Sequence, residues 1–273
     1  MRPLKIAVCI KPVPDPKQWN KLTLDPRTML LARGAIPAVI NPLDRVAIEQ
    51  AVQLKAERGG EVSVLTMAPP DAEDQLIEAL AMGCDSAYLL TDKAFAGGDT
   101  LATARCLSAA IRKIGDHDLV FCGGYSLDGS TAQVGPQVAE FLGLPDLTYV
   151  IELEVSDSAL KTRCKTEEGS FSYETDLPAL ITFSTEATRP RLPSMLGLRR
   201  AVGTPITTWT AKELGLDAEQ TGLQGSPTQM LNIFTASTGR KGEILQGTPD
   251  ELATTLLTRL HLKSAPHDSG ATS

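Results

Sequence analysis

The segment GGYSLDGS, residues 123–130, is the part of the sequence best suited to bind an anion. Two glycines follow an apolar run, Gly129 stands close to a predicted helix, and Ser130 and Thr131 add hydroxyl groups. Backbone N–H groups at a helix start can hold a phosphate when glycine lets it approach. An ordinary strand-to-helix loop, with Asp128 or Ser130 as N-cap, accounts for the same residues. An uncompensated carboxylate would repel a phosphate, so Asp128 is expected to cap the helix or to face a ribose hydroxyl.

Three other short segments are predicted to lie at the same edge. KPVPD (11–15) follows the first predicted strand, NPLD (41–44) opens the first long helix, and MAPP (67–70) follows the second strand. Ligands of open parallel sheets bind outside the carboxyl ends of the strands, so these segments should meet in space. MAPP fits the apolar wall of an adenine pocket and fits a packed turn equally well. Within KPVPD, Lys11 and Asp15 are interpreted as a solvated charge pair.

The sequence offers no self-contained catalytic motif. It has no G-x-G-x-x-G fingerprint, no phosphate loop with Gly-Lys-Ser/Thr and no G-x-S-x-G turn. The histidines, His117, His261 and His267, fall in a predicted turn, a terminal helix and the tail, and no spacing matches a metal site. We therefore predict no catalytic residue and no metal, and expect a bound cofactor to carry any reaction.

A late segment, ATRPRLPSMLGLRRA (187–201), combines cations with apolar residues. Four arginines flank the apolar side chains; the set is Arg189, Arg191, Arg199 and Arg200 around Met195, Leu196 and Leu198. Protein interfaces are enriched in methionine and arginine, which favours a docking surface for another protein. A buried return strand with solvated flanks explains the same pattern.

Composition narrows the classes further. The 273 residues carry 26 Lys and Arg against 33 Asp and Glu, a net charge of −7, and 4% aromatic residues. This balance argues against a nucleic-acid-binding surface, which needs clustered cations or stacking aromatics. The five cysteines show no C-x-x-C spacing and are predicted to be buried, reduced thiols. Because no apolar run is long enough for a membrane span or a signal sequence, we expect a cytoplasmic protein.

The first half of the chain alternates two periodicities. Apolar runs at 4–10, 61–67, 86–90 and 118–122 predict buried strands, and the intervening segments predict helices. The helices are expected to start at Pro42 and stop before Gly59, and to span 71–82, 99–114 and 130–143, the last kinked or delayed by Gly135-Pro136. Such alternation predicts a parallel sheet with helices on both faces, an α/β fold.

The second half changes character after Pro145. Four short runs up to ALITFS predict antiparallel hairpins added to the edge of the sheet. Periodicity fades from about Glu186, and 222–247 shows no convincing element, as in an arm ordered by another molecule. Residues 251–262 form a predicted amphipathic helix, followed by a flexible tail over 263–273.

Several motifs in this order resemble the β subunit of electron transfer flavoproteins. The motifs are KPVPD, NPLDRVAIEQAVQLK, ALAMGCDSAYLLTD, DGSTAQVGPQVAEFLGLP and PRLPSMLGLRRA, and the resemblance runs to about residue 260. It implies a Rossmann-like domain over 1–221, with a partner-docking loop at 187–201. It also implies an arm over 222–262 that embraces an α subunit carrying its own FAD.

The resemblance further implies an adenine nucleotide in this chain. The contacts carried over fall on Cys9, Asn41, Pro42, Asp44, Met67, Gly123, Asp128, Gly129, Ser130, Thr131, Ala132, Gln133 and Val134. The backbone of 131–134 would face the phosphates. Arg191, Met195, Leu196 and Arg199 would dock an acyl-CoA dehydrogenase or similar flavoprotein, with Met195 as the apolar anchor.

Two nucleotides fit the resemblance. Simple members hold AMP as a structural ligand, whereas electron-bifurcating members hold a second FAD that takes a hydride from NADH, with ferredoxin as a possible further acceptor. The stretches 92–104 and DGSTAQVGP are more similar to the bifurcating forms, which favours FAD and adds Asp99 and Thr100 as candidates beside it. This chain departs from the usual motifs at Ser130, where aspartate is commoner, and at Thr188-Arg189, which replaces an Asn-Glu pair.

Overall fold

The structure is a computed structural model that describes residues 2–21, 36–229 and 242–260. Its contacts divide the chain into two units, one up to Leu231 and one from Asn232 onward. The first holds the sheet and all the candidate site residues. The histidines at 261 and 267, the tail and the middle of the predicted arm lie outside the described residues.

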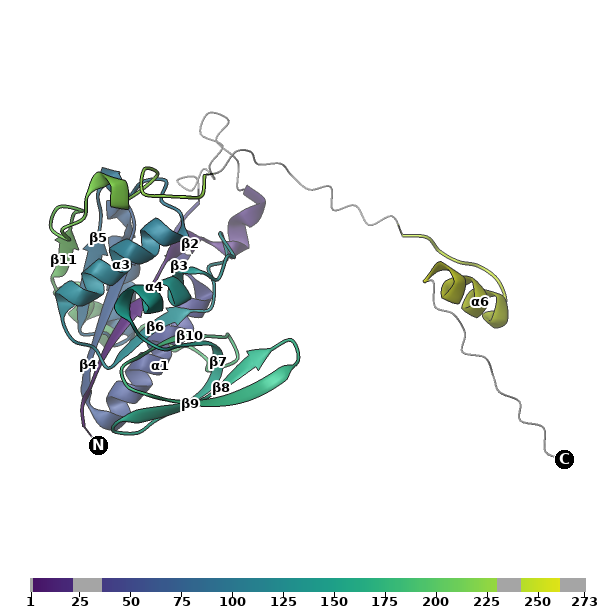
Figure 1. Cartoon of the computed structure of the whole chain (residues 1–273), viewed down its shortest axis with the longest axis horizontal. Coiled ribbons are helices and arrows are strands. Elements are labelled where there is room, and N and C mark those ends of the chain that lie inside the picture. Colours follow the sequence, from purple (N-terminus) through teal and green to yellow (C-terminus); the bar gives the residue numbers. More distant parts are fainter. Residues whose placement is uncertain (1, 22–35, 230–241, 261–273) are drawn as a thin grey trace. The chain divides into compact units, whose positions relative to one another are not determined.

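A nine-stranded sheet forms the centre of the first unit, in the order β11-β5-β4-β1-β6-β10-β7-β8-β9 (Figure 1). Every neighbouring pair from β11 to β7 is parallel, and β8 and β9 add an antiparallel hairpin at one edge. The strands are β1 (Leu4–Cys9), β4 (Gly60–Met67), β5 (Ser86–Leu90), β6 (Leu119–Gly123), β7 (Asp146–Val155), β8 (Ala159–Thr166), β9 (Gly169–Asp176), β10 (Ala179–Phe183) and β11 (Ile206–Trp209).

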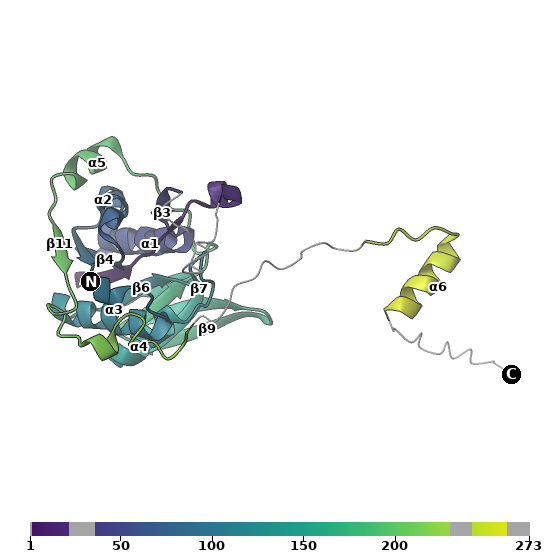
Figure 2. The ribbon, with the colours of Figure 1, turned by 90° about the horizontal axis from the view of Figure 1, so that it is seen from above.

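Helices cover both faces of the sheet. Helices α1 (Pro42–Arg58) and α2 (Glu73–Met82) lie on one face, and α3 (Thr100–Ile114) and α4 (Val134–Leu142) on the other (Figure 2). The chain moves from β1 to β4 and β5 on one side, then returns to place β6 on the other side of β1. The strand order thus reverses between β1 and β6, and that point of an open α/β sheet is where a ligand crevice forms. We call it the switch point.

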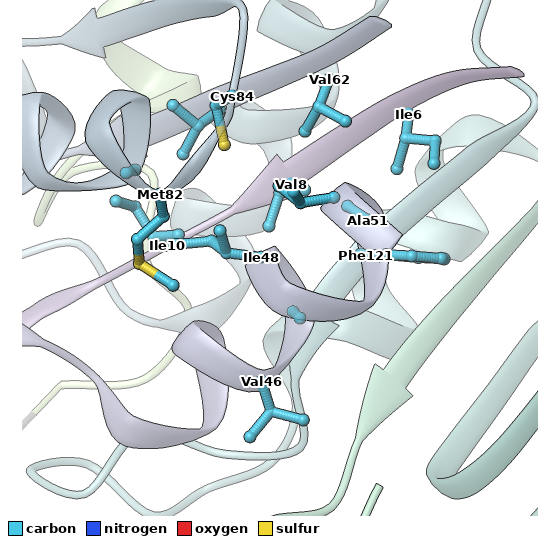
Figure 3. Packing of buried hydrophobic residues seen from close by; sticks show 14 of the residues in the cluster. Ile6, Val8, Ile10, Val46, Ile48, Ala51, Val62, Met82, Cys84 and Phe121 are labelled. Atoms are coloured by element: carbon cyan, nitrogen blue, oxygen red, sulfur yellow. The ribbon is translucent and has the colours of Figure 1, made fainter. Parts of the chain in front are cut away.

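Successive side chains of a strand point to opposite faces of the sheet and so contribute to two core clusters. Along β1, Ile6 and Val8 pack toward α1 and α2, whereas Ala7 and Cys9 pack with residues of α3 and α4. Figure 3 shows the first layer, in which Ile48 of α1 and Phe121 of β6 lie beside β1. A strand buried on both faces has to be apolar at successive positions, which explains the continuous hydrophobic runs of the first half.

The α/β class and the parallel sheet are confirmed, with corrections in the second half of the chain. The run ALITF was expected in an antiparallel hairpin, but it forms β10, a central strand parallel to both β6 and β7. Helix α4 begins at Val134 rather than 130, as the Gly135-Pro136 pair allowed. The ribbon of β2 (Pro12–Pro14) with β3 (Ala38–Ile40), helix α5 (Met195–Ala201) and strand β11 were not predicted.

The second unit contains one described helix, α6 (Pro249–Arg259), close to the predicted span. Thr248 and Glu251 form a capping box at its start, which satisfies backbone donors that a helix leaves free. Leu256, Leu257 and Leu260 are exposed. The helix therefore presents apolar side chains that nothing in its own unit covers within the described residues.

Candidate nucleotide site and docking segment

Asp44 is the centre of the polar contacts at the switch point. Its Oδ2 accepts a hydrogen bond from the N–H of Lys11 at 2.7 Å, and its Oδ1 accepts one from the N–H of Gly123 at 3.1 Å. A Cβ at Gly123 would stand 2.8 Å from the Cβ of Leu43, so only glycine fits there. One carboxyl group, carried by the first turn of α1, thus joins the residues that end β1 and β6.

The environment of Asp44 also alters its acidity. Burial raises its pKa to about 7, against the opposing effect of hydrogen bonds from Asn41, Lys11 and Gly123. The carboxyl group therefore changes charge near neutral pH, in contact with the site.

Asn41 fixes the next part of the loop. Its side chain is fully buried; Nδ2 donates to the carbonyl of Tyr125 at 2.9 Å, and Oδ1 accepts from the N–H of Leu127 at 3.2 Å. Pro42 occupies the first turn of α1, where its missing N–H costs nothing. The predicted residues Asn41 and Asp44 are thus brought together, and their side chains hydrogen-bond to the backbone of the loop 123–130.

Lys11 compensates the charge of Asp128. Its Nζ lies 2.7 Å from Asp128 Oδ1 and donates to Ser126 Oγ at 3.2 Å, while the Asp128 side chain is only 2% exposed. Lys11 was expected to pair with Asp15, and the fold instead joins it to a residue 117 positions away. The repulsion that an isolated Asp128 would exert on a phosphate is therefore reduced.

The backbone amides that follow Ser130 lack hydrogen-bond partners among the described residues. Within the described part of the chain, the N–H groups of residues 131–135 donate to no acceptor, side chain or backbone. Ser130 and Ala132 have φ values of 51° and 56°, which alternate the direction of successive amides and start α4 only at Val134. Alternating right- and left-handed backbone of this kind forms an anion-binding concavity. A Cβ at Gly129 would stand 3.3 Å from Ser126 Oγ and 3.7 Å from Lys11 Nζ, so glycine keeps a side chain out of a part of the loop that is already closely packed.

The start of α3 lies next to the start of α4. Thr100 Oγ1 donates to Gln133 Oε1 at 3.2 Å, which places these two predicted residues side by side. Asp99 caps α3, since its Oδ1 accepts from the N–H of Ala102 at 3.0 Å. Burial alone would raise the pKa of Asp99, but hydrogen bonds from the N–H groups of Ala102 and Thr228 outweigh it and keep that pKa low.

Two of the predicted contact residues, Cys9 and Met67, lie in or against the hydrophobic core. Met67 ends β4, half-buried, and packs against the cluster that contains Cys9 and Cys122. Hydrogen bonding to Cys9 and burial raise the pKa of Cys122 well above its ordinary value, so it remains a neutral thiol. All five cysteines are buried and free, as predicted.

No group of three metal-binding side chains occurs in the described residues, nor does any helix there have the length and apolarity to cross a bilayer.

The docking segment, residues 187–201, is a separate region that ends with α5. Arg191 attaches this segment to α1: its Nε and Nη2 donate to the two carboxylate oxygens of Glu49 at 2.7 and 2.9 Å. Glu49 is 4% exposed, and although burial would raise its pKa, the contacts with Arg191 lower it. Gly197 packs α5 on α2, because a Cβ there would overlap the carbonyl of Ala81. The predicted docking residue Arg191 thus holds the segment on α1.

The remaining predicted docking residues face solvent. Met195 is 81% exposed and Leu196 73%, and the guanidinium of Arg199 has no acidic partner in the described residues. Leu192 is as exposed as Met195 and was missed by sequence analysis, although its place directly after Arg191 in the same segment could have indicated it.

Comparison with known proteins agrees with this architecture. Residues 28–214 match the model of the electron transfer flavoprotein domain. The chain is 44% identical to the electron transfer flavoprotein subunit beta of Thermoanaerobacterium thermosaccharolyticum over 94% of this chain and 98% of that protein. It is 41% identical to the caffeyl-CoA reductase-Etf complex subunit CarD of Acetobacterium woodii, over 95% and 99%. It is 38% identical to the acryloyl-CoA reductase electron transfer subunit gamma of Anaerotignum propionicum, over 95% and 99%. The chain therefore belongs to the electron transfer flavoprotein family, as a member of its β subunits.

Proposed function

We propose that this β subunit binds the adenine nucleotide part of FAD at the switch point and takes part in flavin-based electron bifurcation with an α subunit. The observation that carries the proposal is the row of five N–H groups, at residues 131–135, that have no acceptor among the described residues. Backbone donors of this kind at a helix start bind anions, and a phosphate is an anion with matching oxygens.

The chain's own residues would fix and orient the nucleotide. The amides of 131–135 would donate to its phosphate oxygens, while Lys11 keeps the carboxylate of Asp128 neutralised behind them. Asp44 and Asn41 would keep the loop from closing on the bound group, since they join it to β1 and α1. When bound, FAD would supply the two-electron acceptor for NADH and the exit of single electrons.

The position of Thr100 favours FAD over AMP. Its contact with Gln133 extends the polar lining from α4 to the start of α3. A diphosphate with a flavin would use both helix starts, whereas AMP would use only the amides of α4. The printed names of the relatives add support, because two of them are electron transfer subunits of CoA-ester reductases.

The partners belong to the same proposal. An α subunit with its own FAD would complete the heterodimer, and an acyl-CoA dehydrogenase or similar flavoprotein would receive electrons at the docking segment, with NADH as donor and ferredoxin as a second acceptor. The α6 unit, with its exposed leucines, would contact the α subunit.

Counting nucleotides in the purified heterodimer tests the proposal. We expect two flavins per heterodimer and no AMP in an acid extract analysed by chromatography. One flavin with one AMP would replace bifurcation by simple electron transfer. A heterodimer with one flavin and no adenylate would refute nucleotide binding by this chain.

A further inference from the structure

Left-handed backbone at residues other than glycine occurs at three positions of the described chain. They are Ser130, Ala132 and Tyr149, with φ values of 51°, 56° and 53°. This conformation crowds a side chain against its own backbone, and it is least favourable for a bulky residue. Such strain is retained mostly where a functional site requires it. Ser130 and Ala132 shape the row of amides at the start of α4, so the tyrosine is the one whose conformation still needs an explanation.

Tyr149 lies at the same edge of the sheet as this row. The register of the parallel strands places Gly123 of β6, Phe183 of β10 and Val150 of β7 side by side. Gly123 ends β6, and the loop 123–135 begins there. Tyr149 is therefore two strands away from β6, at the level where this loop leaves the sheet.

The ring of Tyr149 contacts the beginning of the loop. A Cβ at Gly124 would stand 3.1 Å from Cε1 and 3.2 Å from Cδ1 of Tyr149, so the ring lies against this buried glycine. The N–H of Gly124 donates to the carbonyl of Phe183 at 2.9 Å. The ring thus covers the residue by which the loop is attached to β10.

The backbone of Tyr149 supports the other end of the loop. Its N–H donates to Oγ1 of Thr182 at 3.2 Å, and Thr182 is 2% exposed. A Cβ at Gly135 would stand 2.5 Å from Cγ2 of Thr182, so the first turn of α4 packs directly on the same threonine. Tyr149 therefore contacts one end of the loop with its ring and reaches the other end through Thr182.

An irregularity in the strand explains the backbone of Tyr149 but not its side chain. Near this residue β7 changes from parallel pairing with β10 to antiparallel pairing with β8, and its register shifts against both neighbours. Such a bulge needs a residue that tolerates left-handed backbone, which glycine or asparagine does at a lower cost than tyrosine. The ring is an addition that the bulge does not require.

We propose that Tyr149 is a positioning residue of the nucleotide site, which holds the loop 123–135 in its phosphate-binding shape before the nucleotide arrives. This inference rests on the proposed function, since it names the residue that prepares the same site. A loop that already has its bound shape loses less conformational entropy on binding, so pre-organisation increases affinity. The strained backbone at residue 149 places the ring where it provides that support.

The test measures the binding of AMP to the heterodimer by titration calorimetry, after dialysis has removed any bound adenylate. AMP is the probe because it is the part that AMP and FAD share. Tyr149→Asn removes the ring and keeps a residue that tolerates left-handed backbone, and Tyr149→Phe keeps the ring. We expect Tyr149→Asn to weaken binding by roughly tenfold and Tyr149→Phe to stay within about twofold of wild type.

Stability separates positioning from a general structural role. The melting temperature of Tyr149→Asn should stay within about 3 °C of wild type, because relief of backbone strain offsets the lost ring contacts. A residue that only stabilised the fold would lower stability and affinity together. If Tyr149→Asn gives no heterodimer, Thr182→Val decides: it removes the acceptor of the Tyr149 N–H and should weaken AMP binding by roughly threefold.

The matched control is Tyr173→Asn. Tyr173 is exposed on β9, four strands away from β6, and the substitution makes the same chemical change. Its affinity for AMP should stay within about twofold of wild type. Unchanged binding in Tyr149→Asn, a loss in Tyr149→Phe as large as in Tyr149→Asn, or an equal loss in Tyr173→Asn would overturn the positioning role.

Hydrogen exchange of the nucleotide-free heterodimer separates this inference from the proposed function. The N–H groups of Gly124 and Ser130 donate to carbonyl groups, and their exchange should be roughly tenfold faster in Tyr149→Asn. A wild-type heterodimer that neither contains nor binds an adenylate would refute the proposed function, while faster exchange in the variant would still support the action of Tyr149 on the loop. Equal exchange in both proteins would overturn it.

Discussion

The nucleotide site and the docking segment use opposite arrangements of side chains and backbone. At the switch point, side chains such as those of Asn41 and Asp44 are buried and hydrogen-bonded, and the N–H groups of residues 131–135 have no acceptor among the described residues. In the docking segment the backbone is tied down by Arg191 and Gly197, and the side chains face solvent. The first arrangement suits a small ligand held for long periods, and the second a protein that binds and leaves.

This contrast predicts that variants of the two regions fail differently. Changes at the switch point should reduce stability or nucleotide content. Changes in the docking segment should reduce transfer to a partner, with the nucleotide retained.

The largest effect is expected from Asp44→Ala. It leaves the half-buried N–H groups of Lys11 and Gly123 without their acceptor, at a cost of about 3 kcal/mol in the free energy of unfolding. Urea denaturation of the purified chain measures it. Asp71→Ala, which removes an exposed acid, should change that free energy by less than about 0.5 kcal/mol. Equal losses in both variants would contradict the joining role of Asp44.

Gly129→Val should weaken nucleotide binding by roughly 100-fold, equivalent to about 2.7 kcal/mol. The branched side chain would crowd the approach to the amides, and its Cβ would stand 3.3 Å from Ser126 Oγ, whose side chain would have to shift. Adenine nucleotide per heterodimer is the measurement. Gly203→Val, at an exposed turn where the nearest atom to the new Cβ is the carbonyl oxygen of Arg200 at 3.6 Å, is the control and should keep the full content. Unchanged content in Gly129→Val would remove the loop from the site.

Met195→Glu should lower electron delivery to the dehydrogenase by roughly tenfold, because a charge replaces an apolar contact at the centre of the interface. Oxidation of NADH with an artificial dye as acceptor should continue at the wild-type rate. Both activities, electron delivery to the dehydrogenase and oxidation of NADH, are measured on one preparation. A parallel decline of both would show that Met195 serves the fold rather than docking.

The last prediction concerns the dependence of stability on pH. The pKa of Asp44 is about 7 in the folded chain and near 3.8 when unfolded, so the folded state binds the extra proton between these values. Its contribution to the free energy of unfolding therefore falls as pH rises from about 4 to about 7, by at most about 1.4 kcal/mol per unit. Asp44→Asn should remove this slope in denaturation series at several pH values. An identical slope in both proteins would place the effect elsewhere.

The first half of the fold could be predicted because its signals are local. Apolar runs with helix caps at Asn41-Pro42 and Gly59 define elements without reference to distant residues. The place of β10 could not be predicted, because the run ALITF fits any buried strand and its neighbours are chosen by long-range packing. Helix α5 is too short for its periodicity to show.

The site shows the same division. Residues that end strands were found from the pattern, and the loop 123–135 was identified by its glycines. The pairing of Lys11 with Asp128, and of Arg191 with Glu49, joins positions more than a hundred residues apart and has no local signal. These contacts decide which charges remain unpaired: Arg191 pairs with Glu49, whereas Arg189, two residues earlier, has no acidic partner among the described residues.

A crystal structure of the heterodimer, purified without added nucleotide, tests the central claim most directly. The account predicts phosphate oxygens within about 3 Å of the N–H groups of residues 131–135, with the Lys11–Asp128 pair intact behind them. A loop whose N–H groups donate to side chains of either subunit, with no phosphate present, would contradict it.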